Sequence, residues 1–199
     1  MWQYRTPGIP DELFERTQDI PMTKEEIRAL AISKARLKPG DIVIDVGCGT
    51  GSITVEATTQ VLPGGAVYAI DRDRKAIALT ERNLSKFGLK DAVHLIHAEA
   101  TRAFEKLPAA DAILIGSGGQ NLARIIGLSS KKLKREGRIV INSILLETSY
   151  AAINELDRLK FKQVEVLQVT VAKGRRVAQG TMMTARNPIT IISGVKPGK

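Results

Sequence analysis

Five short apolar runs, separated by amphipathic stretches, restrict the fold of this chain more than any other feature of its sequence. The runs cover residues 41–47, 66–71, 92–98, 111–117 and 138–144. Each run is apolar almost throughout, which is typical of a strand covered on both faces, and each gap is long enough for the helix that a parallel connection needs. The alternation therefore predicts an α/β fold with a Rossmann-like, mostly parallel sheet.

The last fifty residues break this alternation. After a helix expected over 147–159, two β-rich runs at 161–171 and 188–195 are joined by a connection rich in glycine, arginine and threonine. Because no helix separates them, the two runs are expected to pair as a C-terminal antiparallel hairpin with a flexible loop. We found no linker-like break, so we predict one domain over 1–199, with an N-terminal arm (1–22) and a core (23–199). Thr23 and Glu26 predict a capping box that opens the first helix.

Composition narrows the class of protein. Of the 199 residues 43% are hydrophobic, and no apolar run is as long as the roughly 18 residues of a membrane span. The first residues show no export signal, so we expect a soluble, cytoplasmic protein. One cysteine and two histidines are too few for disulfides or a zinc site, and no metal is expected. The formal net charge of +9 indicates an anionic partner.

Three alternating glycines, Gly47, Gly49 and Gly51, follow the first strand. In open α/β sheets ligands bind at the carboxyl ends of the strands, and glycines let a ligand approach the backbone there. Ser52 stands where a dinucleotide fingerprint has its third glycine. The loop is therefore expected to bind a ligand other than a dinucleotide pyrophosphate.

Acidic and small residues at the ends of three strands indicate what that ligand is. Asp71 ends the second strand, where a carboxylate can accept hydrogen bonds from both hydroxyls of an adenosine ribose. Asp45 precedes the glycines and would lie near a cationic amino-acid group or order the loop through backbone amides. Ala98, Glu99 and Ala100 are expected beside an adenine, where small residues leave room. A zwitterionic nucleoside, S-adenosylmethionine, fits this set better than a diphosphate.

The segment "VIDVGCGTG" followed by "YAID" resembles the first two motifs of the class I S-adenosylmethionine-dependent methyltransferases. Enzymes of this class that methylate amino groups show Asn or Asp, two prolines and an aromatic residue after the fourth strand, whereas "IGSGGQN" stands here. Gly118 in this stretch would form an open wall for a bulky substrate or for the methionine part of the cofactor. A simple glycine-rich turn explains the stretch equally well.

Two late stretches are candidates for the substrate side. Glu147 and Thr148 are expected at the mouth of the crevice, where Glu147 would either handle a proton or cap a helix. The connection between the last two β-rich runs carries arginines that could bind carboxylates and thioethers that could cover a large apolar face. A solvated basic loop with two buried methionines is the alternative. The candidate substrate residues in this connection are Arg175, Arg176, Thr181, Met182 and Met183.

Nearly the whole chain resembles the decarboxylating cobalt-precorrin-6B methyltransferases of anaerobic cobalamin synthesis. The resemblance rests on "IPDELF", "PMTKEEIRAL", "DVGCGTG", "YAIDR", "ILLET" and "QGTMMTARNPI", although Gln179 stands where the family pattern has an arginine. It implies methylation of carbon 15 of a polycarboxylate corrin precursor, decarboxylation of the acetate on ring C, and a homo-oligomer, commonly a tetramer. It also implies that Thr23, Cys48 and Thr50 join the other loop residues in binding the cofactor.

Two further functions stay open from the sequence alone. A basic methyltransferase of the same fold could act on RNA, but only 4% of the residues are aromatic, which leaves few rings for stacking on bases. Nucleic acid is therefore not the expected partner. The chain could also bind adenosylmethionine without catalysis. Cys48 is expected to fill space in the loop, since no cation that would stabilise a thiolate is evident beside it.

Overall fold

A computed structural model of the chain describes residues 2–116 and 119–198. Seven strands form one sheet in the order β3-β2-β1-β4-β5-β9-β6, in which β1 to β5 run parallel and β9 is antiparallel to both β5 and β6. The predicted mostly parallel sheet with an antiparallel pair at its C-terminal end is confirmed. The strands are β1 (Ile42–Val46), β2 (Ala66–Asp71), β3 (Val93–His97), β4 (Ala110–Ile115), β5 (Leu133–Ser143), β6 (Lys162–Val169) and β9 (Ile189–Val195).

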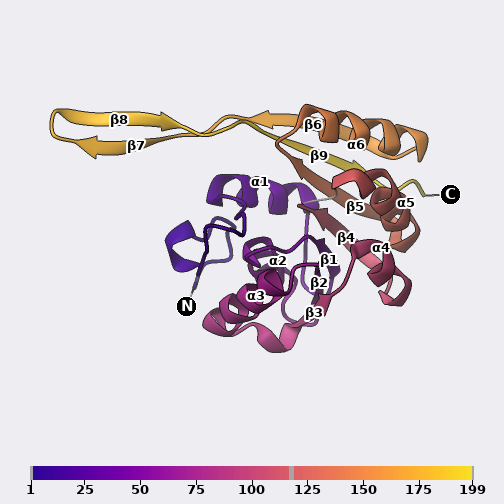
Figure 1. Ribbon diagram of the computed structural model, residues 1–199. Helices are drawn as coiled ribbons and strands as arrows, with labels where there is room; N and C mark the ends of the chain where they lie inside the picture. The colour runs from indigo at the N-terminus through magenta and orange to yellow at the C-terminus, as the bar shows by residue number, and fades with distance from the viewer. Residues whose placement is uncertain (1, 117–118, 199) are drawn as a thin grey trace.

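Helices cover both faces of this sheet (Figure 1). The side chains of β1 alternate between two apolar clusters: Val43 packs with α1 and α2, whereas Ile44 packs with α5 and α6. Burying each such side chain stabilises the fold by about 1.5 to 3 kcal/mol. The helices are α1 (Glu25–Ala35), α2 (Ser52–Val61), α3 (Arg74–Phe87), α4 (Ala100–Ala103), α5 (Leu122–Lys132) and α6 (Leu146–Arg158), with 3-10 turns η1 (Asp11–Leu13), η2 (Lys90–Ala92), η3 (Phe104–Lys106) and η4 (Gly119–Asn121).

The connection between β6 and β9 is a second pair of strands, β7 (Ala172–Val177) and β8 (Gly180–Ala185), and the predicted flexible loop is wrong. These two strands form a separate antiparallel ribbon that extends away from the main sheet (Figure 1). The register places Arg175 opposite Met182 and Arg176 opposite Thr181. Threonine and valine favour extended backbone, and only Ala178 and Gln179 lie between the strands, so a tight turn replaces the loop.

Strand β5 starts at Leu133, five residues before the predicted run at 138–144. Leu133 is buried and pairs with Ala110 of β4, while the register shifts between Ala110 and Ala112. The residues of β5 at this irregularity, 134–136, are polar and exposed. They lack the apolar signature by which a buried strand is recognised in a sequence.

The N-terminal arm packs against the body through apolar side chains. Ile9, Phe14 and Ile20 are buried, and the rings of Phe14 and Phe87 lie 5.0 Å apart between centroids. The predicted capping box is wrong: α1 begins at Glu25, and its first amide donates to Oδ1 of Asp11 at 2.9 Å. A carboxylate from the arm thus replaces the local cap. Among the described residues, no helix is long and apolar enough to cross a membrane.

Candidate functional site

The carboxyl ends of β1 and β2 border a cavity of about 510 Å³. Three parts of the chain meet there: the glycine loop after β1, residues 19–24 where the arm leads into α1, and the end of β5. The cavity brings together most of the residues predicted to bind the cofactor. Those that line it are Thr23, Asp45, Gly47, Cys48, Gly49, Thr50 and Asp71.

A second cavity of about 440 Å³ shares Gly47 and Asp71 with the first. It extends toward the end of β3 and the start of α5, and its lining includes Ala98, Glu99 and Ala100. The two cavities therefore lie on either side of the glycine loop, and together they form one crevice. The residues after β3 that were predicted to lie beside an adenine thus line the part of this crevice away from the arm.

Backbone hydrogen bonds fix the glycine loop across the two strands. The amides of Gly47 and Cys48 both donate to the carbonyl of Ile70, at 2.8 and 3.0 Å. The amide of Gly49 donates to Oδ2 of Asp71 at 3.0 Å. Gly49 has φ of +58°, and a Cβ there would lie 3.2 Å from the carbonyl oxygen of Pro21, so the position favours glycine. The loop is thus closed against the arm.

Gly51 is the one predicted cofactor residue, among those that the structure describes, that lines neither cavity. It precedes α2 with φ of +76°, and a Cβ there would lie 2.7 Å from Cγ2 of Thr80 on α3. Its bare backbone is explained by close packing between α2 and α3, and a ligand is not needed to account for it.

Asp45 is buried at the floor of the first cavity, with 1% of its surface exposed. The Thr54 hydroxyl donates to its Oδ2 at 2.6 Å. Burial raises the pKa of Asp45 to about 7, because a carboxylate loses solvation there; the Thr54 bond works against this shift, and the nearby charge of Asp71 adds to it. Without a cationic partner, a large share of Asp45 is therefore protonated at neutral pH.

Cys48 lines the same cavity but is not poised as a nucleophile. Burial raises the pKa of its thiol far above the ordinary value, and the carboxylate of Asp45 adds to the shift. The Thr80 hydroxyl donates to its sulfur at 3.5 Å, and no cation in the described part of the chain offsets the burial. This agrees with the prediction that Cys48 fills space in the loop.

Two polar atoms in the cavity wall lack partners within the described part of the chain. Oδ1 of Asn142 and Oγ1 of Thr50 are both buried without a hydrogen bond. An unpaired buried polar atom is costly, so these two favour a ligand with complementary polar groups, as adenosylmethionine has. Asn142 was not among the residues predicted from the sequence to bind the cofactor. A polar residue that interrupts the apolar run at 138–144 was the signal that could have identified it.

The predicted substrate residues are not gathered in this crevice. Glu147 and Thr148 lie in the first turn of α6, and neither lines either cavity. Ile144, the residue that follows β5, lines the first cavity instead. Ile144 also opens an exposed apolar patch whose other members are Leu145, Leu146 and Tyr150. Gly118 lies outside the described residues.

The other predicted substrate residues lie on the β7–β8 ribbon, which extends away from the main sheet (Figure 1). Arg175, Arg176, Thr181, Met182 and Met183 are all exposed, and none lines either cavity. The expected alternative of two buried methionines is wrong, since Met182 and Met183 are 45% and 62% exposed. The segment 172–187 contains lysine and arginine but no aspartate or glutamate, so the ribbon is a basic surface.

The sheet order, with its ligand crevice at the ends of β1 and β2, is that of the class I methyltransferases. Within this class the chain belongs to the precorrin methyltransferases: the family model described as "Precorrin methyltransferase domain" matches residues 12–196. The resemblance inferred from the sequence motifs is thereby confirmed.

Individual relatives agree over nearly their whole length. A protein of Saccharolobus solfataricus named "Probable cobalt-precorrin-6B C(15)-methyltransferase (decarboxylating)" is 51% identical over 98% of this chain and 99% of its own. The crystal structure of the precorrin 8W decarboxylase of Methanobacterium thermoautotrophicum is similar with a TM-score of 0.89 at 40% identity, covering 94% of this chain and 98% of that one. The precorrin-6Y C5,15-methyltransferase of Geobacter metallireducens also has a TM-score of 0.89, at 34% identity over 97% and 100%.

Proposed function

We propose that this chain is an S-adenosylmethionine-dependent enzyme that methylates carbon 15 of cobalt-precorrin-6B and decarboxylates the acetate side chain on ring C. The observation that supports it most is the 51% identity, over almost the full length of both chains, to a protein named for that reaction. The crevice with Asp45, Asp71 and two unpaired polar atoms is the site at which we place the cofactor.

We assign the cofactor contacts as follows. Asp71 accepts from the ribose hydroxyls, Ala98 to Ala100 border the adenine, and Asp45 faces the cationic methionine part. Asn142 and Thr50 supply polar atoms that have no partner among the described residues. The bound cofactor supplies an electrophilic methyl group on a sulfonium. The chain's own contribution is to orient that group and to exclude water from the crevice.

For the substrate, we place the apolar face of the corrin on the exposed patch at Ile144 to Leu146 and Tyr150, which adjoins the cavity. The net charge of +9 favours approach of a polycarboxylate. The acceptor is an electron-rich ring carbon, so a strong general base is not required, and the ring can accept the electrons left by carbon dioxide. Glu147, exposed at the start of α6, remains a hypothesis for proton handling.

We further propose that the protein works as a homo-oligomer, a tetramer by resemblance. The β7–β8 ribbon extends from the body with exposed Val177, Met182 and Met183, which a second copy would cover. In such an assembly Arg175 and Arg176 would bind carboxylates of a substrate held by a neighbouring copy. Within one chain neither arginine lines the crevice. We also propose that the protein is located in the cytoplasm.

Methyl transfer with competing acceptors tests the assignment. The protein is incubated with methyl-labelled adenosylmethionine and either cobalt-precorrin-6B or unmodified tRNA. Label in the corrinoid alone supports the proposal. Label in the tRNA alone would favour the RNA methyltransferase alternative, and binding of the cofactor without label in either acceptor would favour a non-catalytic protein.

A further inference from the structure

We propose that Arg28 is a positioning residue for the cofactor crevice. From inside the fold, its guanidinium secures the chain before α1, so that residues 19–24 form one wall of the cavity. The identity of the ligand in this inference rests on the proposed function, whereas the arrangement of the wall does not. Arg28 lines neither cavity, so its influence on the ligand passes through the residues that it binds.

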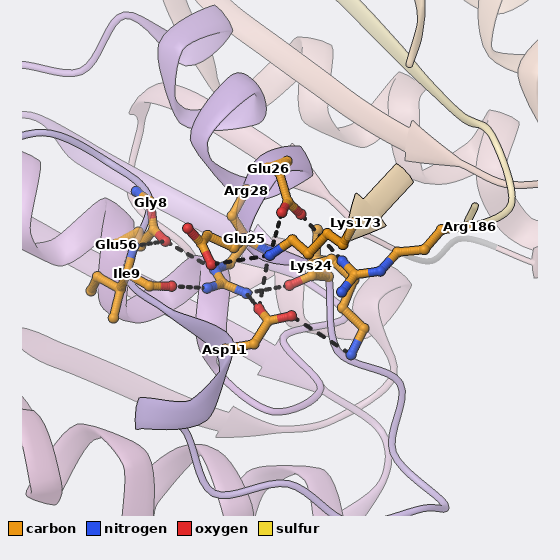
Figure 2. Close-up of polar contacts among 11 residues, drawn as sticks. Gly8, Ile9, Asp11, Lys24, Glu25, Glu26, Arg28, Glu56, Lys173 and Arg186 are labelled. Carbon is orange, nitrogen blue, oxygen red and sulfur yellow. Dashed lines mark hydrogen bonds and ion pairs between the residues drawn. The ribbon is translucent and has the colours of Figure 1, made fainter. Parts of the chain in front are cut away.

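Arg28 lies at the centre of a buried polar cluster (Figure 2). Its side chain is fully buried, as is that of Glu56, and Asp11 is 3% exposed. Nε donates to Oε1 of Glu56 at 2.9 Å, and Nη1 donates to Oδ1 of Asp11 at 2.8 Å. The guanidinium also donates to the carbonyl oxygens of Thr23 and Ile9. One side chain from α1 therefore binds two residues of the arm, the backbone at Thr23 and Glu56 of α2.

The two carboxylates extend the same attachment. Oε1 and Oε2 of Glu56 accept from the amides of Ile9 and Gly8, each at 3.0 Å. Asp11 accepts the first amide of α1 and lies 3.8 Å from the Lys24 ammonium. Apart from Glu56, the residues that the Arg28 guanidinium binds within the described part of the chain lie before α1, at residues 9–23. The cluster thus fixes the position of the arm and makes no contact with the strands of the sheet among these bonds.

The secured segment forms the wall. Thr23, whose carbonyl Arg28 binds, belongs to the stretch from Asp19 to Lys24 that lines the cavity. Pro21 in this stretch contacts the glycine loop so closely that a side chain at Gly49 would meet its carbonyl at 3.2 Å. The other end is fixed at Glu15, whose amide and carbonyl bond to the side chain of Asn83. Residues 16–22 therefore lie between two fixed points, Glu15 and Thr23, and Arg28 holds the second.

Loss of the second fixed point lowers the population of the closed wall. If the wall is in place only a tenth of the time, the apparent dissociation constant of the ligand rises about tenfold. The alternative is that the cluster only adds stability to the fold. Charged buried clusters can often be replaced by apolar groups without loss of stability, so stability and ligand affinity are separable by experiment.

The test compares the double variant Arg28→Met/Glu56→Gln, which leaves no buried charge unpaired at Glu56, with wild type. Titration calorimetry measures affinity for S-adenosylhomocysteine, and limited trypsin digestion without ligand measures exposure of the bond after Arg16. We expect affinity about tenfold weaker or more, and faster cleavage after Arg16. Asp11→Asn is a milder second variant for the case in which the double variant does not fold, with a smaller shift in the same direction.

Two controls separate positioning from stability and from charge. Leu156→Ala removes a fully buried side chain on α6, across the sheet, and is expected to lower stability without changing affinity. Glu26→Gln removes a charge from the same helix as Arg28 and is expected to leave affinity unchanged. Wild-type affinity and unchanged cleavage in folded Arg28 and Asp11 variants would overturn the inference. If wild type itself bound no S-adenosylhomocysteine, the proposed cofactor would be wrong, and the cleavage rates would still test the wall.

Discussion

Gly49 and Asp71 are joined by a hydrogen bond from the Gly49 amide to Oδ2 of the carboxylate, at 3.0 Å. The other carboxylate oxygen accepts the Asp73 amide at 2.9 Å, so Asp71 connects the glycine loop to the turn that leads into α3. One side chain thus shapes the loop while retaining acceptor capacity toward the crevice. The cofactor contacts that we propose depend on this double use.

Replacing Asp71 with alanine removes both uses at once. Hydrogen bonds to a charged group contribute about 1.5 to 3 kcal/mol, so affinity for S-adenosylhomocysteine should fall by about 10- to 100-fold. Titration calorimetry measures this loss. Asp91→Ala, in η2 and outside both cavities, is the control and should bind as wild type does. Equal affinity in Asp71→Ala and wild type would contradict the assignment of Asp71.

The pKa of Asp45 predicts a pH dependence of cofactor affinity. Burial raises this pKa to about 7, so the carboxyl is largely neutral at pH 6 and ionised at pH 8. A cationic cofactor favours the ionised form, and affinity for adenosylmethionine should therefore increase from pH 6 to 8 and then level off. In Asp45→Asn the increase should disappear, because the amide does not titrate. A wild-type profile as flat as that of the variant would be evidence against a cation beside Asp45.

The same group affects the stability of the ligand-free protein. The folded pKa of about 7 exceeds the ordinary value of 3.8, so the folded state binds the proton more tightly between these values. Stability from this group is then complete below about pH 4 and is lost as the pH rises to about 7. Urea unfolding at several pH values should show this loss in wild type and its absence in Asp45→Asn.

The thiol of Cys48 should react slowly with thiol reagents in the folded protein. Its pKa is raised by burial, so the reactive thiolate is scarce at pH 8. Labelling kinetics followed by absorbance measure the rate, and unfolding in guanidinium should increase it by orders of magnitude. Rapid stoichiometric labelling of native protein would show that the loop is more open than the structure indicates.

The Arg28 cluster predicts an unequal effect of single and double replacement on stability. Arg28→Met alone leaves the Glu56 carboxylate buried without its cation, which should cost about 3 to 5 kcal/mol. Adding Glu56→Gln should recover much of this loss, since the amide still accepts from the arm. Urea unfolding measures both free energies. Equal stability of the two variants would mean that Glu56 finds another partner.

Much of the fold could be predicted from the sequence because a doubly covered parallel strand must be apolar along its whole length. The runs at 41–47 and 66–71, which are apolar apart from their aspartates, show this directly. The first half of β5 and the ribbon of β7 and β8 could not be predicted in this way. At Lys134 and along 172–185 the strands are exposed, so neither period nor apolar character marks them.

The residues of the candidate site likewise differ in how far the sequence could predict them. Asp45, Asp71 and Gly49 follow strands and carry local patterns, so their shared location follows from sheet topology alone. Thr23 and Asn142 reach the cavity from distant parts of the chain, and Arg28 acts through contacts 5 to 28 residues away. Such contacts depend on tertiary packing, which a single sequence does not display.

Removing the β7–β8 ribbon should change the oligomeric state without changing cofactor affinity. Replacing residues 174–183 with a short turn should leave affinity for S-adenosylhomocysteine unchanged, because no ribbon residue lines the crevice. The molecular mass in solution should fall toward that of one chain, because the exposed methionines are removed. Light scattering measures the mass. An unchanged oligomer would place the contact between copies elsewhere.

The most direct measurement is the mass of the product formed from adenosylmethionine and cobalt-precorrin-6B. Our account predicts a product that has gained one methyl group and lost one carbon dioxide, with S-adenosylhomocysteine formed in equal amount. Wild-type protein should give this product and Asp71→Ala much less of it. Substrate recovered with neither change, from folded protein that binds the cofactor, would contradict the proposed reaction.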